Sequence, residues 1–278
     1  MQKLAVTHTN ISNVKNGSVM QKSDLLAVEE PLEIRIGYGD MKREEKKIAV
    51  TMRTPGQDLE LALGFLFTEG IIRSASNIVS IRHCENVKEE EQGNVVRVEV
   101  SPEVDINLAG LERNFYTTSS CGVCGKASID SIHQQCERIK SDCVFAEAVI
   151  HASPQTLREA QNVFEHTGGL HAVGLFDTTG KLILLREDVG RHNAFDKLVG
   201  AILNTSIKPE EHFILVSGRA SFELVQKAVM LGIPLMAAVG APSSLAVDLA
   251  EKSNLTLLGF VRNNSFNIYT NTFRVIGS

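Results

Sequence analysis

The stretch HFILVSGRASFELVQKAVMLGIPLMAAVGAPSSLAVDLAEKSNLTLLGFVR, residues 212–262, decides the fold class of this chain. Short apolar runs typical of buried strands alternate in it with two longer segments typical of helices. Strands that follow one another through helices are joined by right-handed crossovers and pair in parallel. We therefore predict an α/β unit with a mixed, largely parallel sheet and flanking helices.

The residues before this stretch add a hairpin and two helices to the same unit. The segment HAVGLFDTTGKLILLRED, residues 171–188, predicts a hairpin, and residues 188–204 predict a helix. Further upstream, SPQTLREAQNVFEHTGG predicts another helix, with Ser153 as its cap and Pro154 at its first position. The second half of the chain is thus an α/β domain.

The first half of the chain has a different pattern. Alternating apolar and polar residues predict strands, and an apolar stripe at helical spacing predicts one helix. The expected elements are two paired strands over residues 27–39 and 46–54, a helix over 54–70, and a hairpin from 78–87 to 95–100. This pattern indicates an α+β domain.

The length of 278 residues favours two domains over one. We expect a loose N-terminal arm over residues 1–22 and an α+β domain over residues 23–118. A loop with two cysteines and a linking helix should occupy residues 119–145, and the α/β domain residues 146–278.

The composition limits where this protein works and what it binds. Hydrophobic residues make up 43% of the chain and charged residues 22%, so the chain can bury a core. The net charge of −5 argues against a nucleic-acid partner, and no apolar segment is long enough to suggest a membrane partner. The first residues lack an apolar signal core, so we expect a cytoplasmic location. Five cysteines are too few, and odd in number, for a disulfide scaffold, so a close pair in a reducing compartment favours a catalytic or metal-binding role.

The segment TTSSCGVCGKAS, residues 117–128, carries the cysteine pair Cys121 and Cys124. A glycine follows each cysteine and leaves the backbone open, while the four hydroxyl residues before Cys121 can donate hydrogen bonds to a sulfur anion. This pattern favours an accessible nucleophilic thiolate that carries a group.

Two zinc sites are alternative hypotheses for this cysteine pair. With His133 and Cys136 it offers four soft ligands, although the spacing matches no usual zinc finger. With His83 and Glu85 it resembles the two ligand motifs of a zinc nucleotide deaminase, but Ser120 stands where that signature has proline. We expect no metal site.

A thiol–disulfide oxidoreductase is the third alternative, because a C-x-x-C pair near the start of a helix can exchange disulfides. Thioredoxin-like domains are shorter and usually carry a tryptophan beside the motif, whereas this chain has none.

Two turns at predicted carboxyl ends of strands are candidate phosphate sites. In LVSGRASFE, a strand leads through Ser217, Gly218 and Arg219 to a helix that begins near Ser221. In AVGAPSSLA, a second strand leads to a helix near Ser243. Helix N-termini bind anions, and open α/β sheets bind ligands at this edge, so we expect a phosphate or nucleotide ligand.

The segment REDVGRHNAFDK, residues 186–197, is denser in charge than the start of a helix requires. Asp188 is a candidate helix cap, and His192 and Asp196 lie one helical turn apart. The segment is either an acid/base site or, as we favour, a salt-bridged structural elbow or subunit contact.

Six segments follow one another along the chain: RTPGQDLELALGFLFTEGI, SSCGVCG, REDVGRHNAFDK, SGRASFELVQKA, APSSLAVDLA and LLGFVRNNSFNIYT. Together they resemble the FdhD family, the sulfur carrier proteins required for formate dehydrogenase activity. The resemblance implies a cytoplasmic sulfurtransferase that accepts sulfur from a cysteine desulfurase as a cysteine persulfide. It passes this sulfur to the bis(molybdopterin guanine dinucleotide) molybdenum cofactor before the cofactor enters formate dehydrogenase. The resemblance also implies a homodimer and a cytidine-deaminase-like second domain without zinc.

The same resemblance assigns roles to individual residues. It makes Cys121 the persulfide bearer and Cys124 an accessory thiol for transfer or resolution. It also implies that a GDP- or GMP-like nucleotide can stand in for the cofactor. The segment expected to contact the guanine dinucleotide is Phe260, Val261, Arg262, Asn263, Asn264 and Ser265. Family members commonly carry a glycine and a second basic residue after the arginine, whereas RNNS keeps only Arg262.

Overall fold

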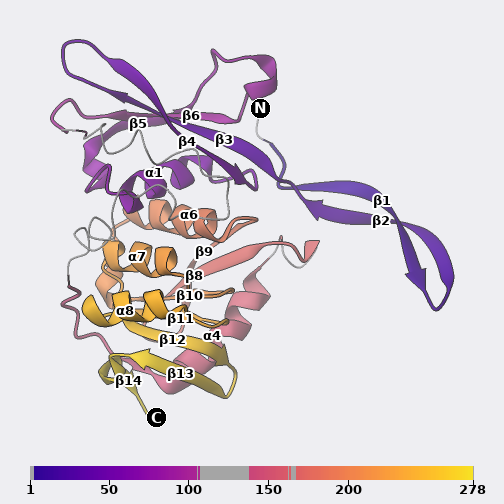
Figure 1. Ribbon diagram of the computed structural model, residues 1–278, viewed down its shortest axis with the longest axis vertical. Coiled ribbons are helices and arrows are strands. Elements are labelled where there is room, and N and C mark those ends of the chain that lie inside the picture. The colour runs from indigo at the N-terminus through magenta and orange to yellow at the C-terminus, as the bar shows by residue number, and fades with distance from the viewer. Residues whose placement is uncertain (1–2, 105, 107–137, 162, 164–166, 278) are drawn as a thin grey trace.

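The computed structural model describes residues 3–104, 106, 138–161, 163 and 167–277. Figure 1 shows two sheets stacked along the long axis of the molecule, with helices α1 and α6 between them. A third, narrow sheet of two strands projects sideways. The mixed α/β architecture that the sequence predicts is confirmed.

The first half of the chain forms a four-stranded sheet in the order β4-β3-β6-β5. The strand bounds are Glu30–Tyr38 for β3, Glu44–Arg53 for β4, Ile78–His83 for β5 and Val95–Val100 for β6. Strands β3 and β4 are antiparallel, as are β5 and β6, while β3 and β6 run parallel. The predicted strand pair and hairpin are therefore confirmed.

Helix α1, Asp58–Thr68, covers the inner face of this sheet. Alternate residues of β3, among them Leu32, Ile34 and Ile36, point toward it and are fully buried. Leu61 and Leu66 of α1 meet them in one apolar core. The apolar residues that alternate along β3 thus face the apolar stripe of α1, as the sequence pattern predicts.

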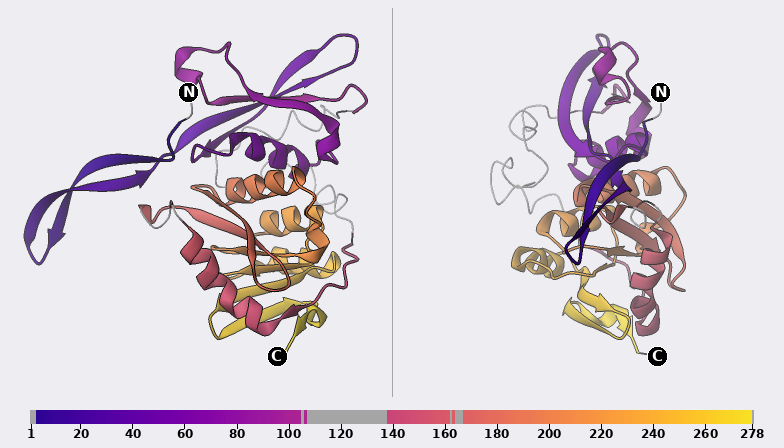
Figure 2. Two further views of the ribbon diagram at one scale, coloured as in Figure 1. Left: turned by 180° about the vertical axis from the view of Figure 1, so that it is seen from behind. Right: turned by 90° about the vertical axis from the view of Figure 1, so that its right-hand side faces the viewer.

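The N-terminal arm is a hairpin, and the expectation of a loose arm over residues 1–22 is wrong. Strands β1, Val6–Lys15, and β2, Ser18–Ala27, pair antiparallel along their full length. Asn16 and Gly17 join them with positive φ angles of 50° and 79°, as a two-residue hairpin turn requires. Because these strands are mostly polar, no alternation of apolar and polar residues in the sequence marks Asn16 and Gly17 as a hairpin turn. Figures 1 and 2 show the hairpin extending away from both larger sheets.

The second half forms a six-stranded sheet in the order β13-β12-β11-β10-β8-β9. The strand bounds are His171–Phe176 for β8, Leu182–Asp188 for β9, Phe213–Val216 for β10, Leu235–Ala238 for β11, Thr256–Arg262 for β12 and Ser265–Thr270 for β13. In this sheet only the neighbouring pairs β10–β11 and β11–β12 are parallel, and the other three pairs are antiparallel. The prediction of a largely parallel sheet is wrong in this respect, because hairpins rather than crossovers join β8 to β9 and β12 to β13.

Helices cover both faces of this sheet. On one face, a single apolar core joins the sheet to α6, α7 and α8, which span Arg191–Leu203, Phe222–Leu231 and Ser244–Lys252. On the other face, Ile150 and Leu157 of α4, Glu147–Ala160, pack in a second core. Short elements complete the chain: strands β7 at Phe145–Ala146 and β14 at Val275–Ile276, and 3-10 helices at Ala75–Asn77, Glu89–Glu91, Pro209–Glu211 and Thr272–Arg274.

The prediction that a helix starts at Ser153 and Pro154 is wrong, because both residues belong to the longer helix α4. It begins at Glu147, and Pro154 lies inside it. Proline has no N–H to donate to the carbonyl four residues earlier, which is that of Ile150. The hydroxyl of Ser153 donates to that carbonyl at 2.7 Å instead. The Ser-Pro pair therefore continues the helix rather than starting it.

The two halves meet where α1 crosses α6. A Cβ on Gly64 of α1 would lie 1.9 Å from the carbonyl oxygen of Asp196, and one on Gly200 of α6 would lie 2.0 Å from that of Glu60. Only glycine allows two helix backbones to approach this closely. The contact fixes the position of one sheet relative to the other.

Candidate functional site

The carboxyl edge of β10, β11 and β12 brings the predicted phosphate turns together. The N–H of Gly240, after β11, donates to the carbonyl of Gly218, after β10, at 2.8 Å. The N–H of Phe260, within β12, donates to the carbonyl of Gly240 at 3.1 Å. Ser243 likewise donates its N–H to the carbonyl of Ala220. These backbone bonds join three segments, far apart in sequence, into one surface.

Ser217, Gly218 and Arg219 lie at this edge in different environments. The Ser217 hydroxyl accepts a hydrogen bond from the N–H of Ala172 at 2.9 Å, so it fastens β10 to β8. Gly218 lies beside the ring of His171. Arg219 is exposed, while its backbone packs against Gly240. Among these three residues, Arg219 has the side chain best placed to meet an anion.

Phe260 and Val261 point to opposite sides of β12. Phe260 has a left-handed backbone with φ 55° and a side chain that is 43% exposed. The pairing of β12 with β13 shifts register between Gly259 and Arg262, and this bulge turns the Phe260 ring outward. Val261 is fully buried in the core beneath α4. Of the two side chains, only the Phe260 ring can contact a ligand at the surface.

The segment from Arg262 to Ser265 forms the turn between β12 and β13. Nη1 of Arg262 donates to the carbonyls of Val239 at 2.7 Å and Val261 at 2.9 Å. Its guanidinium therefore ties the turn to the loop after β11. Asn263 and Asn264 are exposed at the tip, and Ser265 is exposed at the start of β13.

A group of titratable side chains extends the carboxyl edge toward α6. Nε2 of His192 lies 3.9 Å from Oε2 of Glu223, which stands in the first turn of α7. The neighbouring His192 is the main reason why the pKa of Glu223 falls to about 2. Burial, with the nearby Arg191, lowers the pKa of His171. Neither α6 nor α7 has a side-chain cap hydrogen bond.

The REDVGRHNAFDK segment forms the salt-bridged elbow that was one of the two favoured interpretations, although two of its predicted contacts are wrong. Asp188 is not the cap of α6, which begins after Gly190. Its carboxylate accepts hydrogen bonds from the N–H groups of Gly190 and Thr54. It also lies 2.7 Å from the buried Nζ of Lys197. Asp196 bonds to Thr68 and Lys227 instead of His192. The segment therefore links the two halves of the chain.

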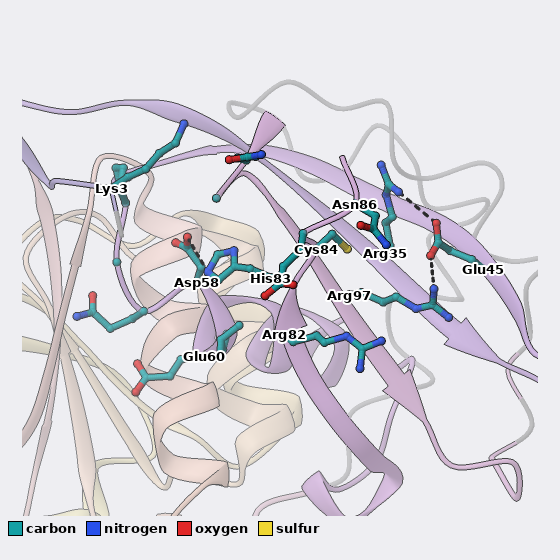
Figure 3. A pocket seen from close by; sticks show the side chains of 17 residues that line it. Lys3, Arg35, Glu45, Asp58, Glu60, Arg82, His83, Cys84, Asn86 and Arg97 are labelled. Carbon is teal, nitrogen blue, oxygen red and sulfur yellow. Dashed lines mark hydrogen bonds and ion pairs between the residues drawn. The ribbon is translucent and has the colours of Figure 1, made fainter. Parts of the chain in front are cut away.

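A cavity of about 1200 Å³ lies in the first half of the chain, around the end of β5 (Figure 3). Arg35, Arg97 and Arg82 are register partners across β3, β6 and β5, so they stand side by side. Glu45 bridges Arg35 and Arg97, at 3.2 Å and 2.6 Å. Cys84 lies among these side chains, and burial raises the pKa of its thiol. The cavity therefore favours the protonated thiol rather than a thiolate.

His83 turns away from Cys84 toward α1 (Figure 3). Its Nε2 lies 3.7 Å from Oδ2 of Asp58, which Arg53 holds through two hydrogen bonds of 2.9 Å. The described part of the chain contains no group of three or more His, Cys, Asp and Glu side chains arranged to hold a metal. His83 and Glu85 thus have no visible zinc partners there. The cysteine pair that would complete a deaminase site lies outside the described residues.

Comparison with known proteins shows which family the chain belongs to. A family model described as the FdhD/NarQ family matches residues 27–276. The chain belongs to the FdhD/NarQ family. The sulfur carrier protein FdhD of Streptomyces avermitilis is 49% identical over 271 residues, covering 95% of this chain and 94% of the relative. The sulfur carrier protein FdhD of Mycolicibacterium paratuberculosis is 48% identical over 275 residues, covering 95% of this chain and 97% of the relative.

A solved structure shares the fold of this FdhD/NarQ family member. It is a candidate formate dehydrogenase accessory protein from Desulfotalea psychrophila, with 23% sequence identity. The match has a TM-score of 0.77 and covers 98% of this chain and all of the other. At this identity the likeness concerns the arrangement of the sheets and helices alone.

Cys121 and Cys124, the predicted persulfide bearer and accessory thiol, lie outside the described residues, as do His133 and Cys136. Their predicted roles stay predictions. The described cysteines are Cys84 and Cys143, and burial raises the pKa of both thiols. In the described part of the chain, no helix is long and apolar enough to cross a membrane.

Sequence reasoning missed two parts of the site. His171 looked like an ordinary strand residue, yet its place beside Gly218 puts it at the carboxyl edge. His151 of α4 bonds to the carbonyl of Arg262 at 3.0 Å. No spacing signal connects positions 151 and 262, so only the tertiary structure could reveal this contact.

Proposed function

We propose that this chain is a cytoplasmic, homodimeric sulfur carrier. It takes sulfur from a cysteine desulfurase as a persulfide on Cys121. It delivers that sulfur to the bis(molybdopterin guanine dinucleotide) cofactor before the cofactor enters formate dehydrogenase. The observation that carries the proposal is the match to sulfur carriers named FdhD, at 49% and 48% identity over nearly the whole chain.

Sulfur acceptance is a thiolate displacement. The Cys121 thiolate attacks the outer sulfur of the desulfurase persulfide, and a new S–S bond forms on Cys121. The S–S bond of the donor breaks, and the donor cysteine leaves as a thiolate. No net oxidation or reduction occurs, because the sulfane sulfur moves from one thiol to another.

Sulfur release requires two electrons, which Cys124 can supply. Its thiolate attacks the inner sulfur of the Cys121 persulfide and forms a Cys121–Cys124 disulfide. The outer sulfur leaves as hydrosulfide, which is the form that molybdenum binds as a ligand. Two equivalents of a cellular thiol, or one dithiol, then reduce this disulfide, become oxidised to a disulfide themselves and restore both cysteines.

The carboxyl edge supports the nucleotide-binding half of this proposal. The Phe260 ring is exposed and oriented by a bulge, so it offers a flat apolar face for a guanine base. Arg219 can meet a phosphate, and Asn263, Asn264 and Ser265 can donate hydrogen bonds. The proposal includes a cytidine-deaminase-like second domain that needs no zinc.

Intact mass analysis tests the sulfur-carrier role. After incubation with a cysteine desulfurase and cysteine, the protein should gain the mass of one sulfur atom, and a reductant should remove it. Cys121→Ala should show no gain, whereas Cys84→Ala should gain as the wild type does. If Cys121→Ala still accepts sulfur and supports formate dehydrogenase activity, the assignment of the bearer is wrong.

Metal analysis of the same sample separates the alternatives. Stoichiometric zinc without sulfur transfer would favour the deaminase-like enzyme. Reversible disulfide formation without any sulfur gain would favour a thiol–disulfide oxidoreductase. Binding of GDP, lost in Phe260→Ala, would support the nucleotide site independently of the cysteines.

A further inference from the structure

The sheet formed by β1 and β2 has no other described strand beside it. The two strands contact chiefly each other, and their hairpin extends away from both larger sheets (Figures 1 and 2). Apolar side chains along it are exposed, including Val19 at 64%, Met20 at 57% and Leu26 at 46%. A hairpin of two strands is marginally stable in water unless another strand or surface supports it. Within the described residues, the arm lacks the support that such a hairpin needs.

The outer edge of β2 carries a regular row of outward-pointing backbone groups. The N–H of Val28 donates to the carbonyl of Ala5 at 2.9 Å, and the same register continues along both strands to the turn. In an antiparallel pair, alternate residues direct both their N–H and their C=O to the partner strand. The even-numbered residues of β2 therefore bond to β1, and the odd-numbered ones, from Val19 to Ala27, direct these groups outward. Such an edge is a template for pairing with another chain.

Backbone geometry limits how the β2 edges of two copies can pair. A two-fold dimer presents the same edge of each copy to the other. The two strands then run antiparallel, and outward-pointing residues must lie opposite outward-pointing residues. The registers that satisfy this condition with the fullest overlap of β2 are centred on Ser23 or on Lys22.

The charged side chains of β2 select the register centred on Ser23. This register sets Lys22 of each copy opposite Asp24 of the other, so each charge lies beside an opposite charge both along and across the strands. Neither side chain forms an ion pair with a described residue of its own chain. The register centred on Lys22 would instead set the two lysines opposite each other. The edge of β1 offers no such pairing, because that strand contains no acidic residue.

The same register brings exposed apolar side chains together. Met20 of each copy lies opposite Leu26 of the other, on the face of the sheet that carries the charges. These pairs, like those of Lys22 with Asp24, are non-hydrogen-bonded pairs, in which opposing side chains lie closest. Opposite charges and apolar pairs at such positions stabilise a sheet, whereas like charges destabilise it. Backbone groups, charges and apolar side chains therefore all fit a second copy of this chain.

We propose that two copies of this chain dimerise through the outer edges of their β2 strands, in the register centred on Ser23, and form a continuous four-stranded antiparallel sheet. The two arms then run in opposite directions, and the tip of each lies near the base of the other. The inference gives an interface to the homodimer of the proposed function, and to that extent it rests on the proposed function.

Charge reversal at positions 22 and 24 tests both the interface and its register. Lys22→Asp and Asp24→Lys each turn both cross-strand pairs into like-charge pairs, so each alone should raise the dissociation constant of the dimer at least about tenfold. The double variant restores opposite charges and should dimerise as the wild type does. Lys42→Asp is the matched control, because Lys42 is exposed in the turn after β3, at the end of that strand away from the arm. It should leave the dissociation constant, measured by analytical ultracentrifugation, unchanged.

An equimolar mixture of the two single variants is the sharper test. In a mixed dimer, one copy carries two acidic side chains at positions 22 and 24 and the other carries two lysines, so both cross-strand pairs are opposite again. Native mass spectrometry should show the heterodimer in excess of both homodimers, and this recovery would also exclude misfolding of the single variants. Weak dimers that the mixture does not restore would overturn the register.

Two further outcomes separate the interface from the proposed function. Equal dissociation constants for the wild type and all variants would show that the copies meet elsewhere, and would overturn the interface while the homodimer stands. A wild type that is monomeric at every concentration would overturn both the interface and the homodimer. In either case, the gain of one sulfur atom in mass, measured on the same samples, still decides the sulfur-carrier role.

Discussion

Nζ of Lys227 lies 2.8 Å from Oδ1 of Asp196, and both side chains are buried between the two halves of the chain. The hydroxyl of Thr68, on α1, bonds to both of them at 2.8 Å. A residue from the first half thus completes a charged pair formed by α6 and α7. The network makes the orientation of the sheets depend on three residues that lie far apart in the sequence.

Removing one partner of this pair should destabilise the fold strongly. Lys227→Met leaves the Asp196 carboxylate buried without its cation, which typically costs about 3–5 kcal/mol in the free energy of unfolding. Urea unfolding of the wild type and the variant measures the loss. The double variant Asp196→Leu with Lys227→Met should recover most of it, because no buried charge remains. A double variant that is as unstable as the single one would show that packing, rather than charge, explains the effect.

Gly64→Ala should separate the two halves or distort both helices. The new methyl group would lie 1.9 Å from the carbonyl oxygen of Asp196, and neither backbone can move away without disturbing the core. Overpacking of this kind costs about 1–3 kcal/mol, which thermal unfolding can measure. Gly277→Ala is the matched control, because an added Cβ there meets no atom within 4 Å. Equal melting temperatures for the two variants would contradict the close helix contact.

The sequence predicts those parts of the architecture in which the interacting residues lie close together along the chain. It does not predict contacts between residues that are far apart in the sequence. The strands and helices of residues 212–262 follow from local pattern, and they form as expected. The partner of Asp196 could not be found in this way. Spacing pointed to His192, one turn away on the same helix. In the structure Asp196 turns toward buried Lys227 on another helix, where desolvation makes a full charge partner necessary.

The candidate site shows the same limit. Ser217, Gly218 and Arg219 were predictable because ends of parallel strands meet at one edge of a sheet. The outward turn of Phe260 depends on a bulge against β13, and Arg262 depends on a loop that follows another strand. Such contacts arise from register and backbone geometry, which residue types alone do not encode. The hairpin formed by β1 and β2 could likewise not be predicted, because its strands are mostly polar and lack an apolar face.

Glu223 should make stability depend on pH in the acidic range. Its pKa is lowered from 4.5 to about 2 in the folded protein, chiefly by His192. A lowered carboxyl pKa stabilises the fold above the unfolded value, and this contribution disappears as pH falls from about 5 toward 2. Glu223→Gln should therefore be less stable than the wild type at pH 6, by at most about 3 kcal/mol. The difference should shrink steadily on acidification.

Urea unfolding of both proteins between pH 6 and pH 3 checks this prediction. His192→Gln should remove most of the pH-dependent part, since it removes the group that holds the carboxylate. A difference between wild type and Glu223→Gln that stays constant down to pH 3 would mean that the carboxylate is not stabilised by its surroundings.

Phe260 should lower the stability of the fold through its left-handed backbone and contribute to GDP binding through its ring. Two substitutions separate these effects. A left-handed conformation costs a residue with a Cβ about 1–2 kcal/mol, whereas glycine adopts it freely. Phe260→Ala and Phe260→Gly both remove the exposed ring, so both should lose GDP affinity to a similar extent. Because φ is 55° at this position, Phe260→Gly should be more stable than Phe260→Ala by about 1 kcal/mol, the reverse of their usual order in a strand. Isothermal titration with GDP and urea unfolding measure the two effects separately. If both variants bind GDP as tightly as the wild type, the Phe260 ring does not contact the guanine base. If Phe260→Ala is more stable than Phe260→Gly, the backbone at this bulge is not left-handed in solution.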